Sequence, residues 1–380
     1  MNLARPFWLG RLDEAWKKAP IVWLAGVRRI GKTTLARSLP HTLYLNCDLP
    51  STGERVADPE KFLRSVGERT LVLDEIHQLP DPSRILKIAA DEFPRLRVLA
   101  TGSSTLAATG KFRDSLSGRK RVVHLLPVLA SELPTFGVTD LRRRLLRGGL
   151  PRALLAETHA PDLYAEWLDS YFARDVQELF TVSKRTAFLS LVELLLRQSG
   201  GLAEVSKLAS MTGLSRPTVM SYLEVIEVTQ VATLLRPYHA GGTQELTHQP
   251  KIYGFDTGFV AWSRGWNELR SPDCGQLWEH VVLETLQAHV VSQGHRVHYW
   301  RDKQQREVDF VVPGQRDSAH AVECKWTLTG FETRGLRAFR TTHPRGRNVL
   351  VVPGERTRER SFGDLAVTIA AAEALEGLLD

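Results

Sequence analysis

The chain is poor in cysteine and has no long hydrophobic run. Its three cysteines, Cys47, Cys274 and Cys324, lie far apart without the spacing of a metal site. We therefore expect small buried side chains and no disulfide framework. No apolar stretch approaches the roughly 20 residues that span a bilayer. Asp13 and Glu14 interrupt the N-terminus where a signal peptide would have an apolar core. These absences predict a cytoplasmic protein without a membrane partner.

Repeats and low-complexity segments are also absent, and the remaining composition is that of a globular protein. The chain has 380 residues, of which 43% are hydrophobic and 24% are charged, enough for two or three domains. The formal net charge is +7 and the pI is about 9.4. This balance suits a polyanionic partner such as nucleic acid, although a basic surface without such a partner fits the charge equally well.

Short apolar strands alternate with helical stretches in the first part of the chain. Buried strands rich in Val, Leu and Ile are predicted at residues 21–26, 42–47, 70–75 and 97–102. Strands separated by helices form a parallel sheet that is covered on both faces. The N-terminal fold class is therefore α/β.

A phosphate-binding loop follows the first of these strands. The stretch GVRRIGKT matches G-x-x-x-x-G-K-[ST] at every fixed position, between a strand and a helix. Gly26 and Gly31 let backbone N–H groups approach the phosphates. Lys32 is expected on the β- and γ-phosphates, Thr33 on Mg²⁺ and Thr34 beside them at the helix start. The flanking strand and helix argue against a chance match, so ATP and Mg²⁺ are the predicted cofactors.

Two further strands end in polar residues suited to this site. Asp74 and Glu75 follow a buried strand. We expect Asp74 to hold Mg²⁺ and Glu75 to act as general base on the attacking water. A solvated acidic pair is the alternative, which the P-loop disfavours. After the next strand, Ser103 and Ser104 are both candidates to touch the γ-phosphate or its water, and a simple turn is the alternative.

A basic stretch near residue 120 offers a positive charge for the transferring phosphoryl group. Arg119 is the first candidate for an arginine finger and Arg113 the second. A finger that acts in trans requires self-association of the chain. A basic surface loop fits the same residues equally well.

The stretches GVRRIGKTTLARSLP, LVLDEIHQLPD, TGSS and GGLPRAL resemble the AAA+ ATPases. The resemblance covers roughly the first 150 residues. It is greatest to a bacterial and archaeal group, of the AAA_14 type, in which this domain precedes the C-terminal domain of unknown function 4143. The resemblance implies ATP binding and a conformational change linked to the nucleotide.

Four parts are predicted along the chain from these patterns. An AAA+ P-loop ATPase domain is expected over residues 1–145 and a helical lid or linker over 146–185. A winged helix-turn-helix is expected over 186–245, and a nuclease-like domain over 250–380.

The winged helix is predicted from two short helices and a strand. Helices are expected at 202–209 and 216–224, joined by a turn that contains Gly, with Ser215 capping the second helix. A strand is expected at 231–236. The second helix of this motif can enter a DNA major groove, and the residues that would face the groove are Arg216, Thr218 and Ser221. A module that binds a protein partner fits the same pattern, because this helix carries a single positive charge.

The C-terminal part shows the order α-β-β-β-α-β. A helix at 276–294 precedes three strands, a helix near 335–342 and a strand at 347–354. A final alanine-rich helix is predicted over residues 366–380.

Acidic residues and a lysine cluster on two of these strands. Glu323 and Lys325 share one face of a strand, and Asp309 lies beside them if the hairpin register aligns. Asp309 and Glu323 are candidate Mg²⁺ ligands, Glu279 on the preceding helix completes the set, and Lys325 would orient or deprotonate the attacking water.

This D…E-x-K pattern resembles the restriction-endonuclease-like PD-(D/E)xK nucleases over roughly residues 275–355. The sequence departs from that pattern by having Glu307 as a rival acid and no proline before Asp309. An ion-paired hairpin, or a nuclease fold that no longer cuts, are the alternatives.

Two functions follow from these modules. The first is an ATP-hydrolysing AAA+ protein that acts on double-stranded or branched DNA, with a nucleotide-driven rearrangement of the winged helix and the nuclease-like domain. The second is a nucleotide-controlled switch that binds a protein partner and cleaves nothing. A small-molecule kinase is disfavoured because the long C-terminal part carries a second acidic site.

Overall fold

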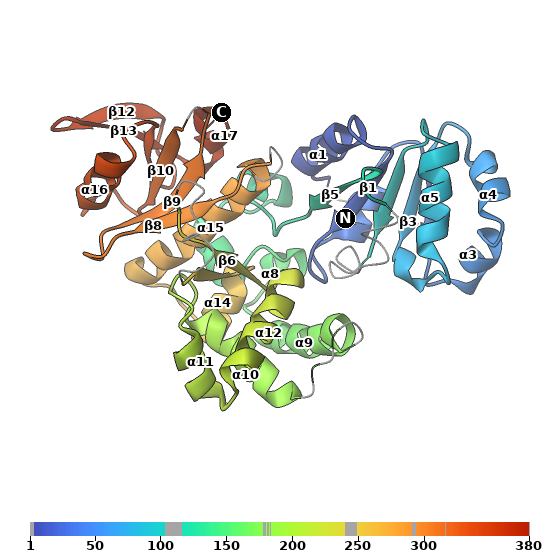
Figure 1. Ribbon diagram of the computed structural model, residues 1–380, viewed down its shortest axis with the longest axis horizontal. Helices are drawn as coiled ribbons and strands as arrows, with labels where there is room; N and C mark the ends of the chain where they lie inside the picture. Colours follow the sequence, from blue (N-terminus) through green and yellow to red (C-terminus); the bar gives the residue numbers. More distant parts are fainter. Residues whose placement is uncertain are drawn as a thin grey trace. The chain divides into compact units, whose positions relative to one another are not determined.

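The computed structural model describes the chain except for residues 1–3, 103–115, 178–179, 181, 183, 240–248, 291–293, 316 and 380. The chain forms two compact units, which are coloured along the sequence in Figure 1. The first unit comprises Met1–Leu126, Glu166–Ser183 and Val228–Gln230, and the second comprises Pro127–Ala165, Lys184–Glu227 and Val231–Asp380. The stretch predicted as a lid is thus divided between the two units.

The first unit is built on a five-stranded parallel sheet. Its strands, in the spatial order β2-β3-β4-β1-β5, are β1 (Ile21–Ala25), β2 (Thr42–Asn46), β3 (Thr70–Asp74), β4 (Val98–Thr101) and β5 (Lys120–His124). The four strands predicted from the sequence are confirmed. Strand β5 lies where the sequence indicated a basic loop or finger, because this edge strand is largely exposed and lacks an apolar alternation.

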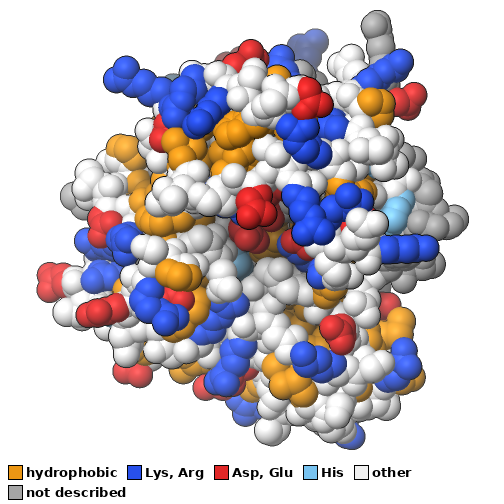
Figure 2. All heavy atoms as spheres, turned by 90° about the vertical axis from the view of Figure 1, so that its left-hand side faces the viewer, with side chains coloured by type: hydrophobic (Ala, Val, Ile, Leu, Met, Phe, Trp, Pro, Cys, Tyr) orange, Lys and Arg blue, Asp and Glu red, His pale blue; other side chains and the backbone are white. Residues whose placement is uncertain are grey.

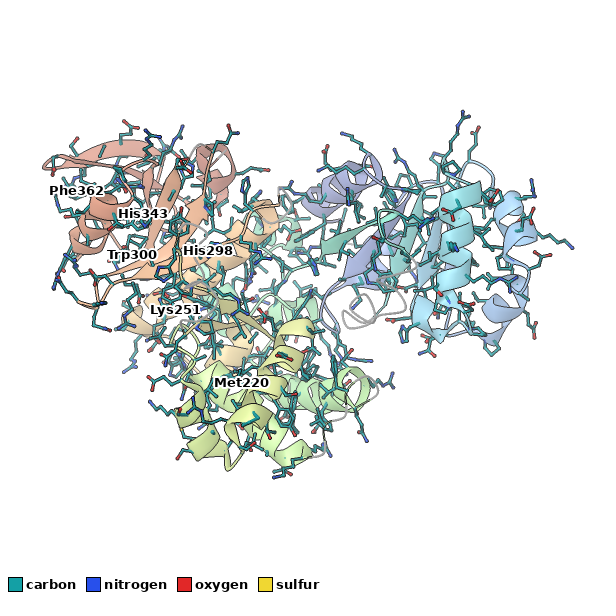
Figure 3. The ribbon with its side chains drawn as sticks, in the orientation of Figure 1. Met220, Lys251, His298, Trp300, His343 and Phe362 are labelled. Atoms are coloured by element: carbon teal, nitrogen blue, oxygen red, sulfur yellow. The ribbon has the colours of Figure 1, made fainter. Side chains whose placement is uncertain are left out.

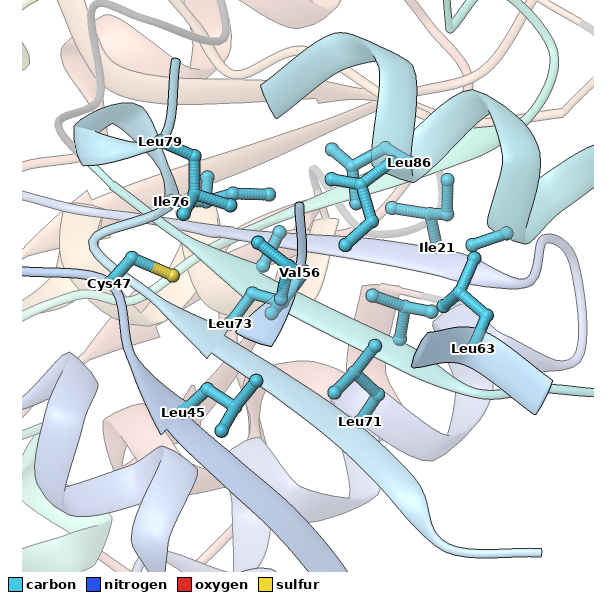
Figure 4. Close-up of a cluster of buried hydrophobic side chains, with 14 of the residues drawn as sticks. Ile21, Leu45, Cys47, Val56, Leu63, Leu71, Leu73, Ile76, Leu79 and Leu86 are labelled. Atoms are coloured by element: carbon cyan, nitrogen blue, oxygen red, sulfur yellow. The ribbon is translucent and has the colours of Figure 1, made fainter. Parts of the chain in front are cut away.

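Helices cover both faces of this sheet. They are α1 (Pro6–Trp16), α2 (Lys32–Arg37), α3 (Pro50–Arg55), α4 (Pro59–Val66), the 3₁₀-helix η1 (Ile76–Gln78) and α5 (Pro82–Glu92). Helix α1 packs on β1 and β5, whereas α2 packs on β3 and β4. Alternate strand residues such as Leu71 and Leu73 join Leu63 of α4 and Leu86 of α5 in one apolar cluster (Figure 4). This cluster holds the parallel sheet whose carboxyl edge carries the P-loop.

The helical part of the second unit begins after residue 126. It contains the 3₁₀-helix η3 (Ala130–Phe136), α7 (Leu141–Arg147), α8 (Pro151–Leu155), the start of α9 (Asp162–Tyr171), α10 (Arg185–Arg197), α11 (Val205–Thr212) and α12 (Arg216–Val228). Helix α9 crosses into the first unit and continues as a π-helix, η4 (Phe172–Val176). An antiparallel pair, β6 (Ala232–Leu235) and β7 (Lys251–Gly254), follows α12. Its second strand lies beyond residue 245, the predicted limit of the winged helix.

The C-terminal part of this unit is a mixed sheet with flanking helices. Its strands lie in the order β12-β13-β11-β10-β9-β8. The elements are α14 (Thr257–Ser263), α15 (Ser271–Val290), β8 (His298–Arg301), β9 (Glu307–Pro313), β10 (Ala319–Cys324), α16 (Arg334–Thr342), β11 (Asn348–Val351), β12 (Arg358–Phe362), β13 (Leu365–Ala370), the 3₁₀-helix η6 (Ala372–Ala374) and α17 (Leu375–Leu379). The predicted element order from α15 to β11 is confirmed. No helix in the described part of the chain is long and apolar enough to span a membrane.

The helix predicted over residues 366–380 is wrong for its first half. Residues Leu365–Ala370 form strand β13, which pairs with β11 and, across a turn at Gly363, with β12. The φ angle of Gly363 is 67°, which suits this turn. Val367 and Ile369 are buried, whereas Ala366 is exposed and Thr368 is half-buried, which is the alternation of a strand. The β-branched residues thus outweigh the neighbouring alanines, and only the last residues are helical.

A buried arginine joins three helices of the second unit. Arg144 on α7 is fully buried and donates to the carbonyl of Val128 (2.8 Å) and to the hydroxyl of Thr257 (2.9 Å), and it is ion-paired with Glu284 on α15. Asp256 accepts the N–H group of Gly149 at 2.6 Å. These contacts explain the GGLPRAL stretch, whose glycines let the chain approach Asp256 and Arg144.

Candidate functional site

The P-loop lies between β1 and α2, as predicted. Gly26 has a φ angle of 148° and Gly31 one of 103°. A Cβ atom on Gly26 would lie 2.7 Å from the carbonyl oxygen of Leu125. Both fixed glycines of the motif are therefore required by the backbone itself, and they leave the loop's N–H groups accessible to an anion.

Lys32 is a buried cation at the first turn of α2. It is 8% exposed, and its Nζ donates to the carbonyl oxygens of Gly26 (2.8 Å) and Val27 (3.2 Å). Burial lowers the pKa of this ammonium, against the opposing effect of Glu75. Among the described residues its hydrogen bonds go to neutral carbonyl groups. A triphosphate would supply the anion that this site needs.

Asp74 ends strand β3 and accepts hydrogen bonds from three hydroxyl groups. Thr33 Oγ1 donates to its Oδ2 at 2.9 Å, Tyr44 donates to the same oxygen at 2.5 Å, and Thr101 donates to Oδ1. The Thr33 hydroxyl and the Asp74 carboxylate are the hard oxygen ligands that Mg²⁺ prefers. The donor set therefore fits the predicted magnesium ion, which would replace the hydrogen bond between them.

Tyr44 and Thr101 were not recognised from the sequence. Burial and the hydrogen bond to Asp74 raise the pKa of Tyr44 to about 12, so its hydroxyl stays a donor. Thr101 also accepts the N–H group of Glu75 at 3.0 Å. The register of β2 on β3 places Tyr44 beside Val72, two residues before Asp74. No local pattern in the sequence signals this proximity, because it depends on the pairing of separate strands.

Glu75 follows Asp74 in a left-handed backbone conformation. Its φ angle is 54°, and its Oε2 lies 3.3 Å from Nδ1 of His77. This sharp turn lies at the carboxyl edge of the sheet, and the Glu75 carboxylate is close enough to Lys32 to oppose the lowering of the lysine pKa. Its role as general base stays a prediction. The other predicted contacts in this region, Ser103, Ser104 and Arg113, lie outside the described residues.

The structure excludes Arg119 as a finger for the nucleotide of its own molecule. Strands β1 and β5 are parallel, with Ile21 opposite Lys120. Arg119 therefore precedes the amino end of the sheet, whereas Gly26 follows the carboxyl end. Its guanidinium pairs with Asp91 at 2.6 Å. The prediction that Arg119 acts on the nucleotide of a second molecule, in trans, remains.

The P-loop is tied to the helical segment 166–176. Arg28 Nε pairs with Asp175 at 2.5 Å, and Arg29 pairs with Glu166 at 2.7 Å. The indole N–H of Trp167 donates to the carbonyl of Arg28 at 2.9 Å. All of these residues belong to the first unit. The variable positions of the P-loop thus hold a segment that includes the π-helix η4.

The second candidate site lies on strands β9 and β10. Val322 pairs with Phe310 in their antiparallel register, which brings Asp309 opposite Glu323 at the next position. Asp309 Oδ2 accepts the backbone N–H of Cys324 at 2.8 Å. The hairpin register that the sequence required is therefore present, and the two predicted acids lie together.

Burial disfavours the charged forms of two carboxyl groups in this cluster. Burial, reinforced by Asp309, raises the pKa of Glu279 to about 8. Burial and Asp309 also raise the pKa of Glu323 well above its ordinary value. Burial lowers the pKa of Lys325, but Asp309 and Glu323 outweigh it and the net shift is upward. Near neutral pH a proton on Glu279 relieves its repulsion with Asp309.

Two side chains from β7 also enter this carboxylate cluster, which we define as Glu279, Glu307, Asp309 and Glu323. Lys251 is ion-paired with Glu307, and Tyr253 donates to Glu279 Oε2 at 3.2 Å. Neither was predicted, because β7 lies at the start of the predicted nuclease-like domain, before the helix and strands whose pattern was recognised.

The cluster as it stands does not fit a divalent metal ion. Among the described residues no group of three or more His, Cys, Asp or Glu side chains is arranged to hold one. The chain's own donors, Lys251 and Tyr253, contact two of its carboxyl groups. The roles of Glu279, Asp309, Glu323 and Lys325 in metal-dependent cleavage therefore stay predictions.

Helix α12 presents both polar and apolar side chains. Ser215 caps the helix by accepting the N–H of Thr218 at 3.3 Å, as predicted, and its hydroxyl lies 2.7 Å from that of Thr218. Arg216 and Ser221 are exposed. Met220 is 56% exposed beside them. The helix surface therefore carries a single arginine and an exposed apolar group.

Comparison with known families divides the chain into three matches. Residues 18–133 match the family described as "AAA domain". Residues 138–270 match "Domain of unknown function (DUF8612)", and residues 274–372 match "Domain of unknown function (DUF4143)". The first match agrees with the P-loop geometry, and the third agrees with the C-terminal domain that the sequence predicted.

Similar proteins cover most of the chain. The uncharacterized proteins Rv2008c of Mycobacterium tuberculosis and Mb2031c of Mycobacterium bovis are each 29% identical over 378 residues, which is 96% of this chain and 83% of theirs. A Walker-type ATPase of Pyrococcus abyssi is a solved structure with 15% identity, and the match covers 67% of this chain and 94% of that one with a TM-score of 0.43.

Proposed function

We propose that the protein binds ATP with Mg²⁺ and hydrolyses it, because residues 18–133 match the AAA domain family and contain the P-loop described above. One observation carries this proposal. The Thr33 hydroxyl and the Asp74 carboxylate lie 2.9 Å apart at the carboxyl edge of the sheet, beside the buried ammonium of Lys32. A metal–triphosphate complex satisfies the lysine and the carboxylate at once.

Each residue of this site has a defined task in hydrolysis. Lys32 balances the charge of the β- and γ-phosphates, and Thr33 and Asp74 would hold Mg²⁺, which neutralises charge on the same phosphates. Glu75 accepts a proton from the attacking water. The bond from the water oxygen to the γ-phosphorus forms as the bond to the bridging oxygen breaks, and ADP and phosphate leave.

The ion pairs of the P-loop supply a route from the nucleotide to the rest of the chain. The phosphates would compete with Asp175 for Arg28 and with Glu166 for Arg29. Loss of these pairs frees the segment 166–176, which leads along the chain towards α10. Nucleotide binding would thus change the restraint on the chain that enters the second unit.

We further propose that the second unit acts on DNA. Three helices, α10 to α12, are followed by the strand pair β6–β7, the order expected of a winged helix. The net charge of +7 favours a polyanion. On the face drawn in Figure 2, however, Lys and Arg side chains are interspersed with acidic and hydrophobic ones. Charge alone therefore does not mark a track for DNA, and the proposal rests on α12 and its Arg216.

The test compares ATP turnover without DNA and with single-stranded, double-stranded and branched DNA at several salt concentrations. We expect stimulation by double-stranded or branched DNA, weakened in Arg216→Ala and unchanged in Arg95→Ala, an exposed arginine of the first unit. Turnover without any response to DNA, together with no DNA binding, would refute the DNA role and leave the ATPase proposal intact.

A second candidate is a nucleotide-controlled switch that binds a protein partner. The observation that favours it is the exposure of Met211 (57%) on α11 and Met220 (56%) on α12. Exposed methionines on adjacent helices suit an adaptable apolar contact better than a DNA groove. ATP turnover that is unaffected by every DNA in the same experiment would favour this function, with the nuclease-like C-terminal fold as a surface that does not cleave.

A further inference from the structure

Strand β7 brings two hydrogen-bond donors into the carboxylate cluster. Lys251 and Tyr253 are two residues apart, so their side chains lie on the same side of the strand. They are 4% and 1% exposed. Lys251 is ion-paired with Glu307 on β9, and Tyr253 donates to Glu279 on α15. Figure 3 labels Lys251 where the strand pair β6–β7 meets the C-terminal sheet.

Three of the four carboxyl groups of the cluster, those of Glu279, Glu307 and Asp309, have hydrogen-bond or ion-pair partners within the chain. Glu307 contacts Lys251 and, at 3.6 Å, Arg301. Glu279 accepts from Tyr253, as described above. Asp309 accepts the backbone N–H of Cys324. It lies opposite Glu323 in the strand register, and together with burial it raises the pKa of that carboxyl group.

These contacts balance the buried charge without a metal ion. Burial lowers the pKa of Lys251, but Asp309, Glu279 and Glu307 outweigh it, so the side chain keeps its positive charge. The buried ammonium group of Lys251 supplies, among these carboxyl groups, the positive charge that a bound metal ion would otherwise supply. The chain supplies it from 56 residues away in sequence.

We propose that Lys251 is a built-in counter-ion that keeps divalent metal ions out of the carboxylate cluster. The proposal rests on the nuclease-like interpretation of the C-terminal sheet. A divalent ion held by Glu279, Asp309 and Glu323 would meet the ammonium of Lys251 in a buried space, where water screens repulsion weakly. In this conformation Lys251 thus prevents a divalent metal ion from binding to the cluster.

The experiment titrates Mn²⁺ into the full chain without nucleotide and measures free Mn²⁺ by electron paramagnetic resonance. The variants are Lys251→Met and the double variant Lys251→Met with Glu307→Gln. The double variant removes both partners of the ion pair, so that the half-buried Glu307 carboxylate is not left to pair with the more distant Arg301. Lys303→Met, at an exposed lysine in a nearby turn, is the control with the same change of charge as the single variant Lys251→Met.

We expect the double variant to bind one Mn²⁺ at least about tenfold more tightly than the wild type. Asp309→Asn added to that variant should remove the gain, and the control should match the wild type. Circular dichroism and thermal unfolding verify that each variant is folded. ATP turnover, measured on the same samples, reports separately on the proposed ATPase.

Two results would overturn the proposal, and they differ in what they leave standing. If wild type already binds Mn²⁺ at a site that Asp309→Asn destroys, Lys251 does not exclude metal and the nuclease-like site is intact. If the variants are folded but gain no Mn²⁺ site, Lys251 is not the reason that the cluster binds no metal ion. The nuclease-like interpretation of the C-terminal sheet then fails together with the proposal.

Discussion

The two ionic groups of this molecule use the same residue types in opposite ways. At the P-loop, Lys32 donates to neutral carbonyl groups and Asp74 accepts from neutral hydroxyl groups. In the carboxylate cluster, Lys251 is paired directly with Glu307. The first arrangement leaves its charges to be balanced by a ligand, whereas the second balances them internally. The hydrogen-bond and ion-pair partners of the charged side chains, and not the number of lysines and acids, distinguish a site that can bind a charged ligand from one whose charges are already balanced.

The largest effect is expected from Lys32→Ala. Two charge-assisted hydrogen bonds to phosphate are worth about 3 kcal/mol, so ATP affinity should fall by about 100-fold or more. Isothermal titration with ATP and Mg²⁺ measures it, and Lys87→Ala on the exposed face of α5 is the matched control. An ATP affinity within about twofold of wild type would show that Lys32 does not bind the phosphates. The contrast between the P-loop and the carboxylate cluster would then fail.

Glu75→Gln should separate binding from chemistry at the first site. The amide keeps the size of the side chain but cannot accept the proton of the attacking water. We expect ATP turnover to drop by about 100-fold or more while ATP affinity stays nearly unchanged. A steady-state phosphate-release assay measures the rate. A variant that turns over ATP normally would exclude Glu75 as the general base.

The second group predicts a dependence of stability on pH. Burial raises the pKa of Glu279 in the cluster to about 8, and it does the same to Glu284, which lies on the same helix α15 beside Arg144. In the unfolded chain these groups are already deprotonated at neutral pH, so the unfolded state binds fewer protons. The free energy of unfolding should therefore fall as pH rises through about 8, by at most about 1.4 kcal/mol per pH unit for each group. Burial lowers the pKa of His280 to about 4 from 6.5, so the measurement belongs above pH 6.5.

Urea unfolding of the second unit's transition at several pH values between 6.5 and 8 tests this slope. Glu279→Gln should reduce it by the share of one group, whereas Glu332→Gln, at an exposed position, should leave it unchanged. A slope that Glu279→Gln does not alter would mean that Glu279 is charged in the folded protein, and the cluster would then carry more negative charge than the pair of Lys251 with Glu307 balances.

The smallest effect on ATP binding is expected from changes to the ion pairs between the P-loop and the helical segment 166–176. Asp175→Asn removes the partner of Arg28 and leaves the guanidinium to the phosphates, so ATP should bind about threefold to tenfold more tightly. In an Arg28→Ala background the same change should have no effect on ATP affinity, because the competition is gone. Weaker ATP binding in Asp175→Asn would contradict the proposed competition.

Much of the nucleotide site was predictable because its parts are local in sequence. The loop between Gly26 and Thr33 contains its glycines, its lysine and its hydroxyl within eight positions, and an apolar strand before it sets the direction of the chain. Asp74 was predictable because parallel strands end at a common edge. Tyr44 and Thr101 were not, since their hydrogen bonds to Asp74 depend on which strands are neighbours.

Strand and helix were confused where local composition and tertiary pairing disagree. Alanines around residue 371 indicated a terminal helix, but Val367 and Ile369 pack into the C-terminal sheet beside β11. Burial on a sheet face outweighs helix propensity, which differs by less than about 1 kcal/mol between such residues.

By itself the sequence determined the P-loop, the four strands predicted around it, the element order from α15 to β11, and the acids and lysines available for chemistry, because short-range periodicity and motif spacing encode these. Only the tertiary structure decided which edge of the sheet receives Arg119 and which cation meets the carboxylate cluster. Both depend on strand order and register. These join residues far apart along the chain through buried contacts that no local pattern reveals.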